Sequence, residues 1–161
     1  MSRQRGKYKV HFWRDIFSDY SRRKKFRNMK RIHCEIEAMY PFLLDPDPVV
    51  RLGAVGYASQ LNGGLDAVSN LRYDTDWRVK HKVVSILAHR GDPLFLVDIL
   101  WDKDIKLQQR AIYGIGNRGD RLLRSLLLLK LISPNERVRK SAWYWIRREK
   151  EERATTRSND W

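Results

Sequence analysis

Cysteine is almost absent from this 161-residue chain, which contains only Cys34. One cysteine cannot form an intramolecular disulfide, and we expect a reduced intracellular setting, whether cytoplasmic, nuclear or organellar. Cys34 falls in a helical and partly apolar pattern, which predicts a small buried side chain rather than a nucleophile.

Long apolar segments are also missing, since the longest uninterrupted run is the four leucines at 126–129. The first ten residues, MSRQRGKYKV, contain no apolar core of a signal peptide. The sequence therefore predicts neither a secretory signal nor a transmembrane helix. The Arg-rich and acid-poor start remains compatible with a transit peptide.

The motifs of common catalytic and metal sites are absent as well. The chain has no glycine-rich phosphate loop, no H-E-x-x-H and no Cys/His cluster with metal spacing. The four histidines lie on predicted helices without acidic partners at ligand spacing. We expect no metal, no cofactor and no catalysis.

Acidic residues are few relative to basic ones: 19 Asp and Glu stand against 33 Lys and Arg, for a net charge of +14. Residues 1–31 hold 12 basic and two acidic residues, a net charge of +10, so the excess is concentrated at the N-terminus. This asymmetry indicates a polyanionic partner, with nucleic acid, DNA or RNA, ahead of an acidic membrane surface. The alternative is a solvated basic tail.

An internal repeat organises residues 45–150. Four segments align without gaps, with starts 29, 28 and 31 residues apart. They are DPDPVVRLGAVGYASQL from Asp45, DTDWRVKHKVVSILAHR from Asp74, DKDIKLQQRAIYGIGNR from Asp102 and SPNERVRKSAWYWIRRE from Ser133. A branched aliphatic residue follows five positions after each start, at Val50, Val79, Leu107 and Val138.

The third residue of each repeat predicts a helix start, because Asp47, Asp76, Asp104 and Asn135 can all cap free backbone N–H groups. The helices are expected to end near Gly63, Gly91 and Gly119, where glycine can adopt a left-handed conformation. Asp92 and Asp120 then begin second helices, so each repeat is a helical hairpin of about thirty residues. A hairpin this short must stack on its neighbours to bury its apolar faces.

The pattern D-x-D-x-x-V-R followed by small and aliphatic residues, as in DPDPVVRLGAVGYA, resembles the short HEAT-like repeats of phycobilisome-lyase-type proteins. The resemblance implies an all-α fold, an α-solenoid of about four helical hairpins. We assign residues 26–150 to this repeat domain, with 26–44 as its first outer helix. Residues 1–25 form a basic N-terminal extension and 151–161 a flexible tail.

The resemblance also implies an inner, concave row of helices and a ladder of acid–base pairs. The pairs would be Asp45 with Arg51 and Asp74 with Lys80. The ladder would be interrupted at Asp102/Gln108 and at Ser133/Arg139.

The polar positions of these helices define a basic and aromatic stripe if the helices are inner. The candidate nucleic-acid-binding residues on it are Arg78, Lys82, Lys106, Arg110, Tyr113, Arg137, Tyr144 and Arg148. Arginine and lysine suit phosphate oxygens and tyrosine can stack on an exposed base. The alternative is an ordinary solvated helix face.

The N-terminal block adds Arg22, Arg23, Lys24 and Lys25 to the candidate phosphate contacts, because phosphate neutralisation is cumulative. Before it, residues 8–20 place Val10, Trp13, Ile16 and Phe17 on one helical face. This helix is expected to cap the first repeat, and docking to a membrane or a protein is the alternative.

The sequence thus predicts a non-catalytic nucleic-acid-binding protein. One alternative is a protein–protein adaptor of a larger ribonucleoprotein or viral assembly. A second arises because RVRKSAWYWIRREK resembles a helix of the helical-repeat alkylpurine DNA glycosylases. In that case Asp76 beside Trp77, or Asp102 beside Trp101, would be the catalytic acid.

Overall fold

Every regular element in the described part of the chain is an α-helix or a 3-10 helix. The structure is a computed structural model that describes residue 24, residues 35–119 and residues 121–159, with side chains up to Glu151. The prediction of an all-α fold is confirmed over these residues. None of the helices within these ranges is long and apolar enough to cross a membrane.

The chain divides into two compact units at Val68 and Ser69, where the sequence predicted one repeat domain from 26 to 150. The elements of the first unit are η1 (Ile36–Met39), α2 (Tyr40–Leu43), α3 (Pro48–Ala58) and α4 (Gly64–Ser69). Its core forms where α2 packs on α3, with Met39, Phe42 and Leu43 buried beside Val50 and Val55.

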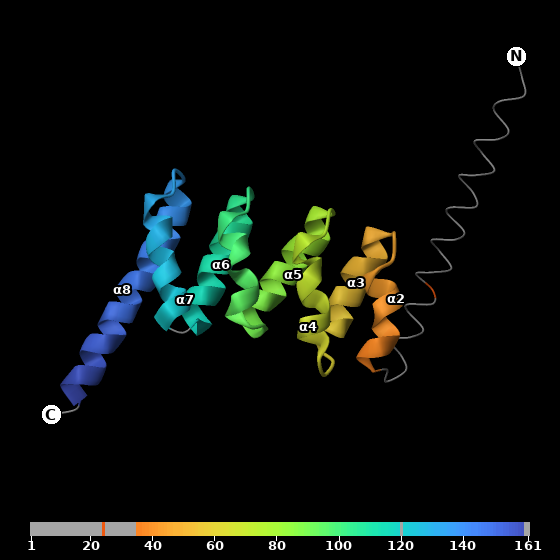
Figure 1. Ribbon diagram of the computed structural model, residues 1–161, viewed down its shortest axis with the longest axis horizontal. Helices are drawn as coiled ribbons and strands as arrows, with labels where there is room; N and C mark the ends of the chain where they lie inside the picture. Colours follow the sequence, from red (N-terminus) through yellow and green to blue (C-terminus); the bar gives the residue numbers. More distant parts are fainter. Residues whose placement is uncertain (1–23, 25–34, 120, 160–161) are drawn as a thin grey trace, which may run out of the picture. The chain divides into compact units, whose positions relative to one another are not determined.

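The second unit contains three of the four predicted repeats (Figure 1). Its long helices are α5 (Trp77–Arg90), α6 (Ile105–Arg118) and α8 (Glu136–Asn159). Its shorter elements are η2 (Asn70–Tyr73), η3 (Pro93–Leu96), η4 (Asp98–Trp101), α7 (Arg121–Ser125) and η5 (Leu126–Ile132). Helix α6 packs against α5 on one side and α8 on the other, so the three long helices form one row.

Each repeat begins with the same pair of local hydrogen bonds. The first side chain accepts from the backbone N–H two residues later, as Asp74 does from Asp76 (2.8 Å) and Asp102 from Asp104 (2.8 Å). The third side chain then caps the helix. The cap bonds are Val49 to Asp47 (2.9 Å), Arg78 to Asp76 (2.9 Å), Lys106 to Asp104 (2.7 Å) and Arg137 to Asn135 (3.0 Å). All four predicted caps are confirmed.

A second recurring bond ties the helix back to this turn. The side chain six residues after the start donates to the carbonyl of the first residue: Arg51 to Asp45 (2.7 Å), Gln108 to Asp102 (2.6 Å) and Arg139 to Ser133 (2.7 Å). The contact therefore continues at the two repeats where the ladder was expected to be interrupted. A carbonyl acceptor explains this, because it needs neither an acid nor a full positive charge.

Lys80 departs from the expected pairing with Asp74. Its ammonium group pairs with the Asp102 carboxylate of the next repeat instead. The prediction placed this bridge within a repeat, and it joins two repeats. The reason is geometric, since Lys80 sits one turn into α5, on the side that α6 packs against.

Helices α5 and α6 end at Gly91 and Gly119 as predicted, whereas α3 ends at Ala58, five residues before Gly63. Gly63 has the left-handed φ of 69°. Gly91 and Gly119 are extended, with φ of −80° and −64°, so the left-handed prediction is wrong there. Close approach explains these glycines: a Cβ at Gly91 would press on Leu87, and one at Gly119 would overlap the Ile115 carbonyl.

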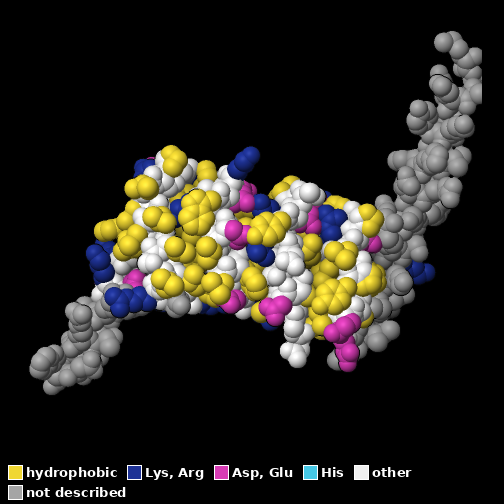
Figure 2. All heavy atoms as spheres, in the orientation of Figure 1, with side chains coloured by type: hydrophobic (Ala, Val, Ile, Leu, Met, Phe, Trp, Pro, Cys, Tyr) yellow, Lys and Arg dark blue, Asp and Glu magenta, His cyan; other side chains and the backbone are white. Residues whose placement is uncertain are grey.

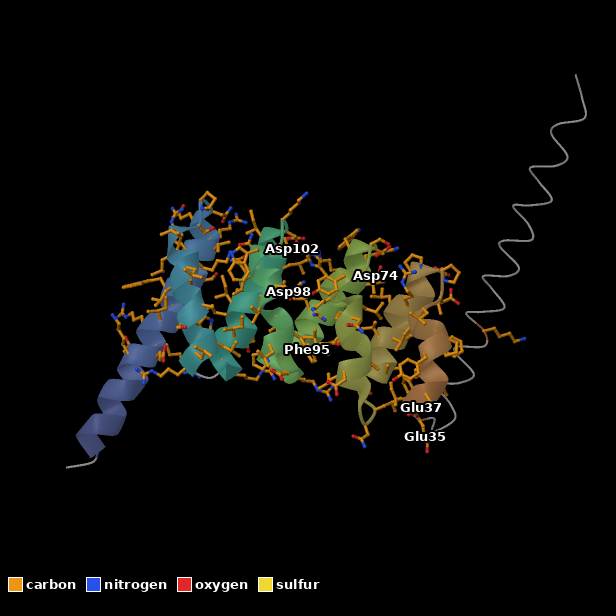
Figure 3. The ribbon with its side chains drawn as sticks, viewed as in Figure 1. Glu35, Glu37, Asp74, Phe95, Asp98 and Asp102 are labelled. Carbon is orange, nitrogen blue, oxygen red and sulfur yellow. The ribbon has the colours of Figure 1, made fainter. Side chains whose placement is uncertain are left out.

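The second helices of the hairpins are short and partly of 3-10 type. Asp92 caps η3 through the N–H of Leu94 (2.9 Å), as predicted. Asp98 then accepts from the N–H of Ile99 (3.1 Å) and from the Tyr73 hydroxyl group. These local bonds compete with a continuous α-helix. Figure 3 shows Asp98 on η4, within unit 2.

Several predicted features fall on residues that the structure does not describe. These are the helix at 8–20, Arg22, Arg23, Lys25, Cys34, the helix start at Asp120 and most of the outer helix at 26–44, of which η1 and α2 are described. At the other end, α8 continues to Asn159, so residues 151–159 are helical where the sequence predicted a tail.

We predict that replacing Asn135 with alanine lowers the free energy of unfolding by about 1 kcal/mol, since the first turn of α8 loses its cap. Asn135→Asp keeps the acceptor and is expected to stay close to the wild type. Urea unfolding followed by circular dichroism measures both variants. Equal loss of stability in both would show that the cap bond contributes nothing.

Candidate nucleic-acid interface

The predicted basic and aromatic stripe lies on α5, α6 and α8, and all its members are accessible. Arg78 and Lys82 are on α5, Lys106, Arg110 and Tyr113 on α6, and Arg137, Tyr144 and Arg148 on α8. Arg110 is half-buried and the other seven are exposed. Because α6 packs against both other helices, the three stripes are neighbours.

Three of these cations have no competing intramolecular contact. Lys82, Lys106 and Arg137 are exposed, and among the described residues none of their charged groups forms an ion pair or a hydrogen bond. Each comes from a different helix of the row. The face therefore offers three cations that an external anion can bind without breaking an existing bond.

Arg78 is held by its own helix cap. Its guanidinium donates to both oxygens of Asp76, with Nη2 to Oδ2 at 2.7 Å and Nε to Oδ1 at 3.1 Å. These hydrogen bonds hold the pKa of Asp76 at about 2, well below its usual range. The carboxylate is thus occupied by Arg78 and by the backbone of α5.

Arg110 is fixed by a chain of contacts that crosses from α6 to α5. Its Nη1 lies 2.7 Å from Nδ1 of His81, and Nε2 of His81 lies 2.5 Å from Oδ2 of Asp104. Since arginine can only donate, Nδ1 of His81 accepts and Nε2–H donates to the carboxylate. The His81 and Trp77 rings also pack edge-to-face, with their centres 5.8 Å apart. This chain orients Arg110 on the face and binds α5 to α6.

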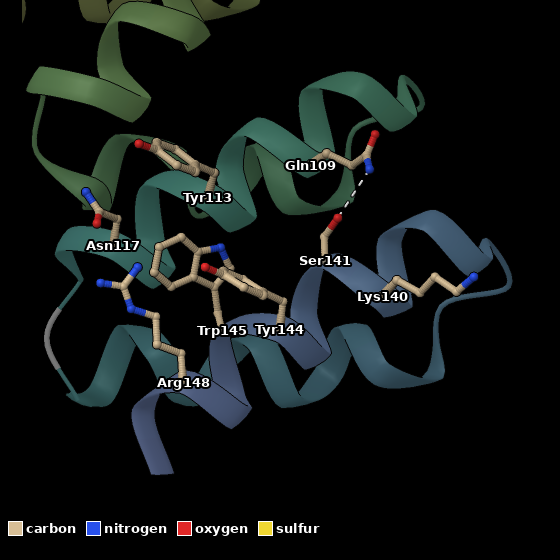
Figure 4. A pocket seen from close by; sticks show the side chains of 8 residues that line it. All are labelled: Gln109, Tyr113, Asn117, Lys140, Ser141, Tyr144, Trp145 and Arg148. Atoms are coloured by element: carbon tan, nitrogen blue, oxygen red, sulfur yellow. Dashed lines mark hydrogen bonds between the residues drawn. The ribbon is translucent and has the colours of Figure 1, made fainter. Parts of the chain in front are cut away.

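An open groove of about 470 Å³ lies between α6 and α8 (Figure 4). It brings together three predicted residues, Tyr113, Tyr144 and Arg148. The other lining residues are Gln109, Asn117, Lys140, Ser141 and Trp145, and no carboxylate is among them. We call this the aromatic groove. Its walls combine flat rings with hydrogen-bond donors and positive charge.

The rings along the groove form a continuous row. The distances between ring centres are 5.1 Å from His89 on α5 to Tyr113, 5.8 Å from Tyr113 to Trp145, and 5.2 Å from Trp145 to Tyr144. The last two pairs are edge-to-face, with interplanar angles of 76° and 84°. The Arg148 guanidinium carbon is 5.1 Å from the Trp145 ring centre. An aromatic surface therefore spans all three helices.

Trp145 is the central residue of the row, and the sequence analysis above omitted it. The stripe followed positions 137, 141, 144 and 148, and Trp145 lies beside that line, four residues after Ser141. The glycine at position 116 on α6 is the one sequence feature that relates to this contact, because a Cβ there would overlap the Trp145 ring. Glycine at this position lets the indole lie against α6.

The other predicted candidates are more scattered. Of the N-terminal basic cluster, only Lys24 is described, and its side chain is exposed. Asp102, a candidate acid of the glycosylase alternative, pairs with Lys80 and accepts from the N–H of Asp104. Within the described ranges, no group of His, Cys, Asp and Glu is arranged to hold a metal ion.

The comparisons with known proteins return no matching family model and no matching curated protein. The interface is therefore argued from its own chemistry alone.

The acidic groups of the repeat starts predict a loss of stability in acid. Burial raises the pKa of Asp102, but the hydrogen bonds from Lys80 and from the Asp104 backbone outweigh it and leave the pKa lowered. The pKa of Asp104 is lowered in the same way, against burial, by its hydrogen bond with His81. A carboxyl group with a lowered folded-state pKa stabilises the fold above its unfolded pKa of about 3.9, and this contribution disappears as the pH falls.

We therefore expect the free energy of unfolding to fall as the pH decreases below about 4. Asp102→Asn keeps the acceptor for the Asp104 N–H but loses the ion pair. This variant should be less stable at pH 7 and should lose less stability between pH 5 and pH 3. Urea unfolding at several pH values measures both effects, and an unchanged pH dependence in the variant would contradict the assignment.

Proposed function

We propose that this protein binds nucleic acid without catalysis, and that the face formed by α5, α6 and α8 contacts an unpaired strand. One observation carries the proposal: Lys82, Lys106 and Arg137, which are unpaired within the described part of the chain, share a face with an aromatic groove that has no carboxylate among its described lining residues. Cations alone would suit any polyanion. Exposed rings beside them favour a ligand with bases.

We further propose that the repeats form a HEAT-like α-solenoid in which this face is the concave one. The recurrence of one turn, one cap and one buried aliphatic column in four repeats supports this. Val50, Val79, Leu107 and Val138 are each at most 1% exposed. In such an architecture, equivalent positions of successive inner helices line one surface.

The cations would supply most of the affinity. Lysine and arginine side chains neutralise phosphates and release condensed counterions, so binding weakens steeply with salt. Lys82, Lys106 and Arg137 provide mobile charges, whereas His81 holds Arg110 in a fixed orientation. The basic residues at 22–25 would add further phosphate contacts.

The aromatic groove would hold bases. Tyr113 and Tyr144 are 41% and 57% exposed, so part of each ring is accessible to a ligand. Asn117 and Gln109 offer amide donors and acceptors to base edges, although Gln109 already donates to Ser141 at 3.2 Å. A paired base in a duplex cannot reach these rings, which is why an unpaired strand is favoured.

The contribution of the cations is tested by salt titration with a fluorescent oligothymidylate. Contacts to about six phosphates of a single strand predict a log–log slope of about −4. Replacing Lys82 and Lys106 together with glutamine should reduce the magnitude of this slope by about 1.4, since each cation contributes about 0.7. The fold should be unaffected, because neither charge has a partner among the described residues.

The matched control replaces Arg121 and Lys150, which line a different cavity, with glutamine. It removes the same charge and should leave the slope close to the wild-type value. The absence of binding at low salt would refute the proposal. If only deletion of residues 1–31 weakened binding, the N-terminal block and not the helix face would be the site.

The role of the rings is tested separately with Tyr144→Ala and Tyr144→Phe. Loss of one stacking partner should weaken oligothymidylate binding by about 1–3 kcal/mol, or about five- to 150-fold, while phenylalanine should retain most of it. Binding to a duplex of equal length should change little. An equal loss for single strand and duplex would rule out stacking on this ring.

A further inference from the structure

A second cavity in unit 2 contains a buried lysine for which the nucleic-acid proposal has no role. The cavity of about 500 Å³ is lined by Trp101, Lys103, Ile105, Gln108, Lys130, Ser133, Pro134 and Asn135. None of these residues belongs to the aromatic groove. We call it the Lys130 pocket.

Lys130 is only 7% exposed, and it has no ion-pair or hydrogen-bond partner for its ammonium group among the described residues. Its Nζ atom lies 4.8 Å from the centre of the Trp101 ring. Burial lowers the pKa of Lys130, and no neighbouring acid offsets this effect. A buried cation without an anion is costly, and a contact with one ring compensates only part of that cost.

The remaining lining groups also suit an anion. Lys103 adds a second, exposed positive charge, and no carboxylate lines the cavity. The Oδ1 atom of Asn135 is occupied in capping α8, which leaves its amide N–H groups as donors toward a ligand. Donors and positive charge therefore dominate the polar part of the wall.

The elements that carry Trp101 and Lys130, η4 and η5, also expose apolar side chains. Trp101, Leu128, Leu129 and Ile132 are 54%, 53%, 54% and 84% exposed. Figure 2 shows hydrophobic side chains gathered over the α7 and η5 part of unit 2. Exposed aliphatic and aromatic side chains on the elements that carry a largely buried charge are typical of a protein–protein contact. A sugar–phosphate backbone would leave these apolar side chains without partners.

We propose that the Lys130 pocket binds an aspartate or glutamate side chain of a partner protein, whose neighbouring apolar residues pack on Trp101 and on exposed aliphatic side chains of η5. The carboxylate pairs with Lys130 and accepts from Asn135. The single buried lysine matches one carboxylate charge, and the Trp101 ring beside its Nζ atom shields the pair from water. This assigns protein binding to a surface distinct from the α5–α6–α8 face.

The probe is a fluorescein-labelled ten-residue peptide of glycine, glutamate and leucine, with a counterpart in which glutamine replaces glutamate. We expect saturable binding of the acidic peptide only. Lys130→Met, which keeps the side-chain length, should weaken it by at least about tenfold, because a desolvated ion pair loses one partner. Lys150→Met, which removes one exposed lysine outside both proposed sites, should change binding less than about twofold.

Lys130→Met is expected to fold, since it removes an uncompensated buried charge, and its thermal midpoint should equal or exceed that of the wild type. A second measurement uses the wild-type protein: lysine acylation mapped by mass spectrometry should show Lys130 protected by the acidic peptide. Absent peptide binding, or equal weakening by Lys150→Met, would overturn the proposal. Protection of Lys130 by oligothymidylate would assign the pocket to nucleic acid instead.

Discussion

The backbone N–H groups at the start of each long helix must find acceptors, and the structure supplies them in the same way four times. One short side chain bends the chain by accepting from the residue two positions on, and the next caps the helix. The cap fixes the residue at which each helix begins. Because a helix repeats every 3.6 residues, this fixes which later side chains face outward.

The α5–α6–α8 face exists because these helices begin at equivalent residues of their repeats. When α5, α6 and α8 begin at equivalent residues, their polar positions lie side by side, and contacts can form between helices. His81 accepts from Arg110 and donates to Asp104, while Lys80 pairs with Asp102. The same acids that start α6 therefore also join it to α5. A single substitution at such an acid affects both a turn and a helix contact.

Unit 2 has two positively charged surfaces that differ in their surroundings. The α5–α6–α8 face combines exposed, unpaired cations with a row of rings, a surface that stays wet and favours phosphates and bases. The Lys130 pocket instead holds a largely buried lysine beside the Trp101 ring, for which we propose a carboxylate with apolar neighbours as the ligand. Both carry positive charge. They differ in how exposed it is to water, and the two proposed ligands follow from that difference.

The sequence alone determined the all-helical fold, the starts of the four long helices and their buried aliphatic column. These are local properties, because a cap needs only residues within one turn and an apolar period needs only one helix. It also identified the solvent-facing residues from Arg78 to Arg148, since exposure follows from the same period. Glycine marked two helix ends for a reason other than the one expected, namely close packing.

Only the tertiary structure decided which residues meet. The partner of Lys80 lies 22 residues away in the next repeat, and Trp145 joins the ring row because Gly116 on another helix leaves room for it. The burial of Lys130 likewise depends on how η5 lies against Trp101. Such contacts depend on the distance and rotation between helices, and packing sets both.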